Sequence, residues 1–125
     1  MYLYLIIFTG LNKANINFIW DIAHTVVHEE TVEESYDYLE SYLKHVHIKD
    51  FKKIKSSSSD GDDPYSLWER FVPPGKGNFP LRQFIKLLQQ KNYKGVICLE
   101  TPASYANAEQ CLQDLVCLFE ESVKQ

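Results

Sequence analysis

The sequence predicts an α/β fold with parallel strands, organised as a single domain over residues 1–125 that forms about half of a TIM barrel. Strand-like segments alternate with amphipathic helical segments, and this order implies parallel pairing through right-handed crossovers. A complete (β/α)8 barrel typically needs ~250 residues, whereas this chain has 125. We therefore expect about four βα units, half of the eight in a complete barrel.

The first half of the chain is expected to hold two strands and one helix. In residues 15–21, β-branched and aromatic residues alternate with polar ones, which is typical of a strand. A loop should follow. Thr31 and Glu34 then form a capping box, and apolar residues at helical spacing behind them predict a helix. Residues 44–49 are expected to form the second strand.

The second half should add two strands and two helices. Residues 55–66 are polar and low in complexity, so we expect a flexible loop. A brief third strand over 69–72 leads into a turn rich in proline and glycine. Asn78 is the expected N-cap of the next helix, with Pro80 in its first turn. The last strand covers residues 95–100, and a closing helix follows Pro102.

Charge and composition exclude several classes of protein. A net charge of −4 and a pI near 5.5 give no basic field for nucleic acid or an anionic membrane. The apolar N-terminal run reaches only Gly10, which is too short for a bilayer crossing of ~20 residues. The sequence has three cysteines without CxxC spacing, which are Cys98, Cys111 and Cys117. An odd number of cysteines with this spacing predicts neither a disulfide framework nor a zinc ribbon and is typical of a protein in a reducing compartment. We expect a cytoplasmic protein with neither a nucleic acid nor a membrane partner.

Three ionisable residues should meet inside the predicted barrel. Alternate residues of a strand share a face, and the helices should cover the apolar set. Asp21, His47 and Glu100 then point toward the barrel axis, at or near the C-terminal strand ends where barrel active sites are built. Without partners, the two carboxylates would repel each other, and they and the imidazole would lose solvation inside the barrel. A divalent cation that accepts nitrogen and oxygen ligands removes both problems. The parity of the strands therefore predicts a metal site.

Four short motifs carry a resemblance to a known family. They are Asp21-Ile-Ala-His24, His47-Ile-Lys-Asp50, Pro74-Gly-Lys-Gly77-Asn-Phe, and Asn92-Tyr-Lys-Gly95 leading into Leu99-Glu100. In this order they resemble the C-terminal half of the xylose isomerase-like barrel superfamily, over about residues 15–102. That superfamily includes sugar phosphate isomerases and epimerases, hydroxypyruvate isomerases, inosose dehydratases and zinc AP endonucleases.

The resemblance implies a sugar phosphate isomerase or epimerase with a divalent metal ion, such as Mn, Mg, Co or Zn. It implies that Asp21, His47 and Glu100 are metal ligands and that His24 contacts the substrate, a small sugar or sugar phosphate. Glu100 would also transfer the proton. The family's remaining ligand, a glutamate ending the fourth strand, has no counterpart in this sequence and would lie upstream of Met1. We therefore expect the chain to be incomplete by itself.

The sequence is also compatible with other interpretations. The chain could be a non-catalytic truncated fragment or an association module, and a homodimer or a missing N-terminal half could close the barrel. DNA repair is disfavoured, because the Asp-x-His of zinc AP endonucleases after the sixth strand is absent. Lys49 is interpreted as part of a solvated basic face, although an anionic substrate could also meet it. His45 is interpreted as a structural or surface residue, and Cys98 as a small core residue.

Overall fold

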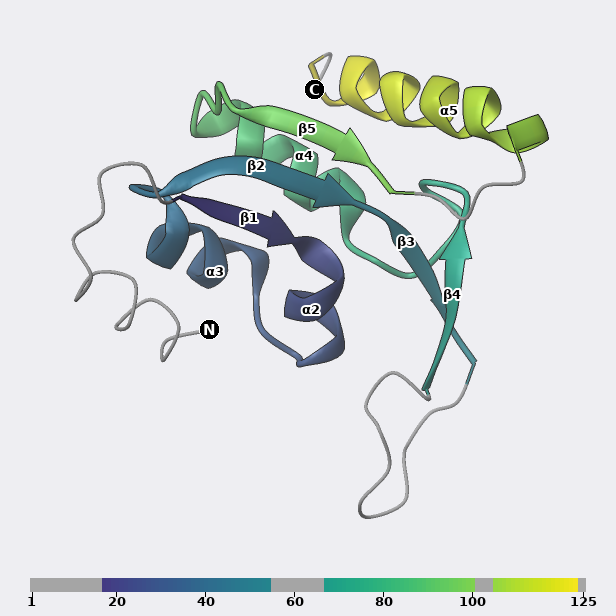
Figure 1. Ribbon diagram of the computed structural model, residues 1–125, viewed down its shortest axis with the longest axis horizontal. Coiled ribbons are helices and arrows are strands. Elements are labelled where there is room, and N and C mark those ends of the chain that lie inside the picture. The colour runs from purple at the N-terminus through teal and green to yellow at the C-terminus, as the bar shows by residue number, and fades with distance from the viewer. Residues whose placement is uncertain (1–16, 55–66, 101–104, 124–125) are drawn as a thin grey trace.

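The computed structural model describes residues 17–54, 67–100 and 105–123 (Figure 1). In chain order the elements are β1 (Phe18–Asp21), α2 (Ile22–Val27), α3 (Val32–Leu39), β2 (Leu43–Ile48), β3 (Asp50–Lys53), β4 (Trp68–Val72), α4 (Leu81–Gln90), β5 (Val96–Leu99) and α5 (Tyr105–Val123). The expected flexible loop at 55–66 and the apolar run at the N-terminus lie outside the described residues. Within the described part, no helix has the length and apolar character needed to cross a membrane.

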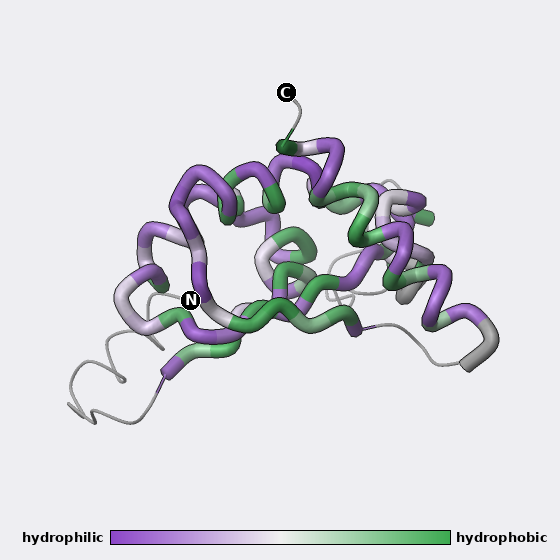
Figure 2. The backbone as a smooth tube through the Cα atoms, turned by 90° about the horizontal axis from the view of Figure 1, so that it is seen from above, coloured by the Kyte–Doolittle hydropathy of each residue, from purple (hydrophilic) through white to green (hydrophobic). Residues whose placement is uncertain are grey.

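The main sheet is parallel and has the strand order β1-β2-β5. Asp21 of β1 is paired with His47 of β2, and His47 is paired with Cys98 of β5. The helices gather on one side of the strands, as the view from above shows (Figure 2). The predicted α/β class with parallel strands is confirmed for these three strands.

The third predicted strand forms, but it does not join this sheet. β4 pairs antiparallel with β3 in a separate two-stranded ribbon. The expectation of four parallel strands is therefore wrong for the described residues, in which three strands are parallel. The physical reason is that β3 continues the chain directly after β2, and β4 returns beside it as a hairpin arm before the helix begins.

Two local details also differ from the expectation. A short helix, α2, stands where a loop was expected, and its N-cap is Asp21, whose side chain accepts a hydrogen bond from the Ala23 amide. Pro80, and not Asn78, is the N-cap residue of α4. Asn78 is used elsewhere, because its side-chain oxygen accepts from the Lys53 amide at 2.8 Å and so joins the turn to β3.

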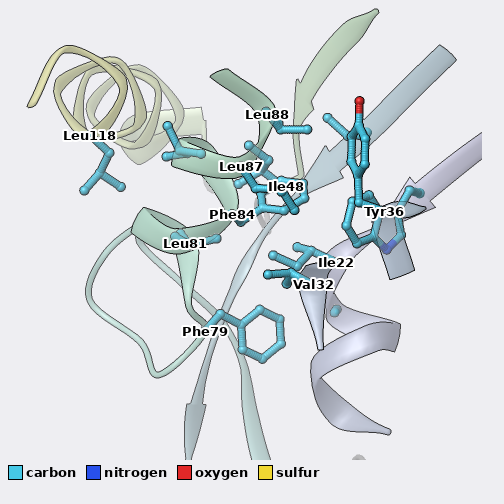
Figure 3. Packing of buried hydrophobic residues seen from close by; sticks show 14 of the residues in the cluster. Ile22, Val32, Tyr36, Ile48, Phe79, Leu81, Phe84, Leu87, Leu88 and Leu118 are labelled. Carbon is cyan, nitrogen blue, oxygen red and sulfur yellow. The ribbon is translucent and has the colours of Figure 1, made fainter. Parts of the chain in front are cut away.

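The hydrophobic core lies between the sheet and its helices (Figure 3). Val46 and Ile48 of β2 are completely buried, as are Phe84 and Ile85 of α4. The ring of Trp20 packs edge-on against Phe84 with centroids 5.0 Å apart. Each large side chain buried in this way contributes roughly 1.5–3 kcal/mol. The predicted packing of the alternating apolar strand residues against the helices is confirmed for β1 and β2, whereas Ile97 of β5, predicted to be covered, is 38% exposed.

The face of the sheet away from the helices is open. Ile19 is 59% exposed and Val96 is 58% exposed, and both lie in the same row as His45. In a complete barrel this face would look toward the axis and be covered by the remaining strands. The polar residues of the predicted site stand on this open face.

Candidate metal centre

The parallel register brings the predicted site residues to one end of the sheet. Asp21 is the last residue of β1 and lies opposite His47, so their side chains stand on neighbouring strands. Glu100 follows β5 directly, and its amide donates to the Ile48 carbonyl at 2.8 Å. Since all three strands run the same way, their C-terminal ends meet at this edge. The convergence of these three side chains therefore follows from strand direction and parity.

Asp21 uses its two carboxylate oxygens for different purposes. Oδ1 accepts from the Ala23 amide at 2.9 Å and caps α2, which is the role expected of an aspartate at a helix start. Oδ2 faces the site, where it lies 3.5 Å from His24 Nε2. The cap fixes the rotamer of the side chain, so capping holds the second oxygen toward its neighbours.

His24 stands at the mouth of the site on the first turn of α2. Its side chain is 66% exposed, although its ring lies beside the Asp21 carboxylate. The buried hydrogen bond from Trp20 Nε1 to Thr25 Oγ1, 2.8 Å long, ties this helix to β1. His24 is therefore well placed to meet a molecule arriving from solvent.

Lys49 is the centre of the cluster, although it was not among the residues expected to form the site. Its Nζ lies 2.8 Å from Asp21 Oδ2 and 2.8 Å from Glu100 Oε2. The residue is only 8% exposed, so its interpretation as a solvated surface cation is wrong. The signal was present in the sequence, since Lys49 comes two residues after His47 and has the same parity.

The position of Lys49 also changes the expected charge balance of the site. The two carboxylates are not without a counter-charge, because the ammonium group bridges them. Burial alone would lower the pKa of Lys49, but hydrogen bonds and attraction to Asp21 and Glu100 outweigh it, and the pKa lies above its usual value. Lys49 therefore stays protonated and balances the site electrostatically.

Glu100 is held in its ionised form by the same contacts. The hydrogen bond from Lys49 is the largest influence and lowers the pKa of Glu100, while partial burial opposes it. His47 adds to the lowering, with Nδ1 3.3 Å from Glu100 Oε2. Glu100 thus links the imidazole and the ammonium group, and it is a carboxylate at neutral pH.

A buried aspartate beside the cluster shapes the rim of the site. Asp50 is 1% exposed, and its carboxylate accepts from the amides of Gly75 and Gly77 at 2.9 Å each and of Phe79 at 3.2 Å. A side chain at Gly77 would meet Asp50 Oδ1 at 2.1 Å and the Phe51 carbonyl oxygen at 2.4 Å. The motif that contains Asp50 and the motif that contains Gly77 are therefore in direct contact with each other.

Comparison with known proteins assigns the family. The family model of the xylose isomerase-like TIM barrel matches residues 5–120. The chain belongs to the xylose isomerase-like TIM barrel family. The comparison with curated proteins gives no significant match.

Solved structures of xylose isomerase-like proteins share the fold. A xylose isomerase domain protein from Planctomyces limnophilus superposes with a TM-score of 0.68 at 17% identity, covering 94% of this chain and 40% of its own. One from Alicyclobacillus acidocaldarius gives 0.64 at 21% identity, covering 91% and 40%. A D-tagatose 3-epimerase-like protein gives 0.58 at 22% identity, covering 89% and 38%. The chain thus spans about 40% of the length of these relatives.

Carboxylate oxygen and imidazole nitrogen are the ligand types that suit a divalent cation of the kind that xylose isomerase-like proteins often bind, although in this structure the ligand atoms of Asp21, His47 and Glu100 do not all lie within 4.8 Å of one another. Two carboxylate oxygens lie at equal distance from one cationic nitrogen, and the imidazole of His47 is the next neighbour of Glu100. Oxygen and imidazole ligands suit magnesium, manganese and zinc. The position of the Lys49 ammonium group shows where a positive charge is already favoured.

Proposed function

We propose that Asp21, His47 and Glu100 are ligands of a divalent metal ion. We further propose that the protein is an isomerase or epimerase that moves a proton on a small sugar or sugar phosphate. The observation that carries the proposal is a pair of carboxylates bridged by the Lys49 ammonium group, with the His47 imidazole beside one of them. It occurs at the C-terminal ends of parallel strands, where enzymes of this barrel architecture have their active sites.

The proposed chemistry is proton transfer at a carbon next to a carbonyl group. A divalent ion bound here supplies Lewis acidity that polarises the hydroxy-carbonyl group of the sugar. Glu100 is the proposed base, because its carboxylate is ionised and 39% exposed toward the open face. Separation from Lys49 would raise its pKa toward the usual range and make it a stronger base.

His24 is the proposed substrate contact. Its exposed ring stands beside Asp21 Oδ2, so one molecule could reach the imidazole and the carboxylate cluster together. Imidazole can donate to or accept from a sugar hydroxyl group. Its part would be to orient the sugar over Glu100, while proton transfer stays with the glutamate.

The rest of the barrel is also part of the proposal. The chain corresponds in length to about 40% of its structural relatives, and we propose that it is the C-terminal half of the barrel. A second copy of the chain or further polypeptide would then cover the open sheet face and complete the site. The activity of the whole enzyme depends on that cover.

Paramagnetic relaxation tests the proposal without requiring turnover. A small ketose is added to the protein with one equivalent of Mn²⁺, and the relaxation of the sugar protons is measured by NMR. We expect faster relaxation of the protons near the carbonyl group in the wild type, and loss of the effect in Asp21→Asn. Exposed Asp37 is a matched control, and Asp37→Asn should behave like the wild type. Equal relaxation in both variants would refute the proposal.

A non-catalytic role is the second candidate, and Lys49 is the observation that favours it. Its ammonium group already neutralises Asp21 and Glu100, so the cluster is stable as an ion-pair network. An association module built on the open sheet face would need nothing more. Absence of any relaxation effect of Mn²⁺ on the sugar in the wild type would support this alternative.

A further inference from the structure

A second group of metal-ligating side chains stands on the open sheet face, next to the candidate centre. His45 and His47 of β2 and Cys98 of β5 each offer one ligand atom, and these atoms lie within 4.8 Å of one another. All three residues are partly buried. No role in the proposed isomerase chemistry uses His45 or Cys98.

The strand register places these residues together. His47 is paired with Cys98 across the parallel strands, and His45 precedes His47 by two residues, so all three side chains share one face. The rings of His45 and His47 lie edge to face with centroids 4.9 Å apart. Because two strands hold the group, its geometry does not depend on a loop.

One ring nitrogen of His45 makes no hydrogen bond with the described residues. This atom, Nε2, is buried, and a buried polar atom without a partner costs about 1–3 kcal/mol. Within the part of the chain that the structure describes, the Cys98 thiol donates one long hydrogen bond, 3.8 Å to the Leu99 carbonyl oxygen. The Nε2 of His45 and the Sγ of Cys98 therefore have few hydrogen-bond partners, and both residues lie close to the His47 imidazole. A metal ion bound by the three side chains would give each of these atoms a partner.

We propose that His45, His47 and Cys98 bind a thiophilic divalent cation, with Zn²⁺ the best match. Zinc takes imidazole nitrogen at ~2.0–2.1 Å and thiolate sulfur at ~2.3 Å, with tetrahedral geometry. The three side chains must move closer together, and the fourth position is left for water or a ligand. This site differs from the carboxylate centre in its sulfur ligand, which disfavours magnesium and favours zinc.

The proposal has two chemical consequences. Binding forms a bond between the metal and the Cys98 thiolate, and the thiol proton passes to solvent, so affinity rises with pH. His47 belongs to both groups, so occupation of the thiolate site competes with the carboxylate centre for one imidazole. The inference does not rest on the proposed sugar chemistry, because Asp21 and Glu100 take no part in it.

Cobalt spectroscopy tests the site directly. Co²⁺ is titrated into the full-length protein under reducing conditions, and the thiolate-to-cobalt charge-transfer absorption in the near ultraviolet is recorded. We expect a saturable band in the wild type that Zn²⁺ removes, with loss of the band in Cys98→Ser and in His45→Gln. The exposed Cys117 gives the matched control, and Cys117→Ser should keep the band.

A variant of the other centre separates this proposal from the proposed function. Asp21→Asn should abolish the effect of Mn²⁺ on the sugar but leave the cobalt band unchanged. The absence of a band in the wild type, or its persistence in Cys98→Ser, would overturn the inference. That result would also fit a partner for His45 Nε2 supplied by another polypeptide segment.

Alkylation of the wild type gives a second readout that no folding defect can imitate. The protein is treated with iodoacetamide with and without Zn²⁺, and the modified peptides are quantified by mass spectrometry. Zinc should slow the alkylation of Cys98 at least tenfold and leave the rate at Cys117 unchanged. Equal protection of the two cysteines, or protection of neither, would contradict the site.

Discussion

At the scale of single residues, the ammonium group of Lys49 holds Asp21 and Glu100 together. It lies 2.8 Å from an oxygen of each carboxylate, in a position where few water molecules screen its charge, since the residue is only 8% exposed. A divalent cation at the same point must therefore displace Lys49 or share the carboxylates with it. At the proposed metal centre, Lys49 would therefore compete with the cation for the two carboxylates.

Replacing Lys49 should strengthen metal binding. In Lys49→Met the carboxylates lose their bound cation, and hydrogen bonds between charged groups contribute about 1.5–3 kcal/mol each. We expect the dissociation constant for Mn²⁺ to fall at least about tenfold, measured by calorimetry at pH 7. Lys52→Met, an exposed neighbour on β3, should leave it unchanged. Weaker binding in Lys49→Met would contradict the competition.

The ion pair of Glu100 with Lys49 should make stability depend on pH in a defined way. The folded-state pKa of Glu100 lies below its usual 4.5, so its stabilisation is complete above that pH and is lost as the pH falls through the lowered pKa. The raised pKa of Lys49 means that its contribution is complete below 10.5 and is lost as the pH rises through the raised value. Between these limits the stabilisation should be constant.

Glu100→Gln measures the acidic side of this dependence. The variant should be less stable than the wild type at pH 7 by at most about 1 kcal/mol, since solvent screens the partly exposed carboxylate of Glu100. The difference should shrink toward pH 3, because protonation removes the same charge from the wild type. Urea unfolding at both pH values provides the measurement, with Glu120→Gln on the exposed surface of α5 as the control. A pH-independent difference would contradict the assignment.

At the scale of elements, the turn before α4 is hydrogen-bonded to the start of β3. The Asp50 carboxylate accepts hydrogen bonds from three backbone amides of this turn. The Asn78 amide donates a hydrogen bond to the Phe51 carbonyl oxygen at 2.8 Å. Gly77 makes this close approach feasible because it has no Cβ. The turn therefore holds the β3–β4 ribbon near the site, on the rim next to Lys49.

A side chain at Gly77 should disrupt this junction. The Cβ of Gly77→Ala would collide with Asp50 and with the backbone of Phe51, and backbone cannot move aside at low cost. We expect a loss of about 2 kcal/mol or more in the free energy of unfolding. Lys76→Ala, an exposed substitution in the same turn, should change it by less than about 0.5 kcal/mol. Equal effects of the two would show that the contact is unimportant.

Alternation along the strands was enough to predict much of the site. It placed Asp21, His47 and Glu100 on one face, because parity is a property of any strand. It did not predict the pairing of β4, since a short run of strand-forming residues says nothing about its neighbour or direction. Helix α2 was missed because its β-branched residues have low helix propensity and only the Asp21 cap indicates a start.

At the scale of the whole molecule, the sheet has a face on which the apolar side chains of Ile19 and Val96 are 59% and 58% exposed. A cleft of about 580 Å³ runs beside β1, lined by Asp21 and His24 and reaching the core residues Trp20 and Leu39. Exposed apolar side chains on a sheet face favour association. We infer that the cleft, which Asp21 and His24 also line, is where a further barrel element packs.

The exposed face should drive association in solution. We expect light scattering to show a concentration-dependent dimer of the wild type, and Val96→Glu to shift it toward monomer, because a charge would be placed in the apolar contact. Val123→Glu, at an even more exposed position on α5, should keep the wild-type behaviour. A wild type that is monomeric at every concentration would indicate that a different polypeptide segment covers the face.

The most direct test of the proposed centre is a titration with Mn²⁺ followed by electron paramagnetic resonance, in which the signal of the free ion disappears on binding. We expect the wild type to bind one equivalent, and Asp21→Asn and Glu100→Gln to bind at least about tenfold more weakly, a loss that even outer partners of a metal site produce. Asp37→Asn and Glu120→Gln should bind as the wild type does. Wild-type affinity in Asp21→Asn and Glu100→Gln would contradict the assignment of these carboxylates as ligands.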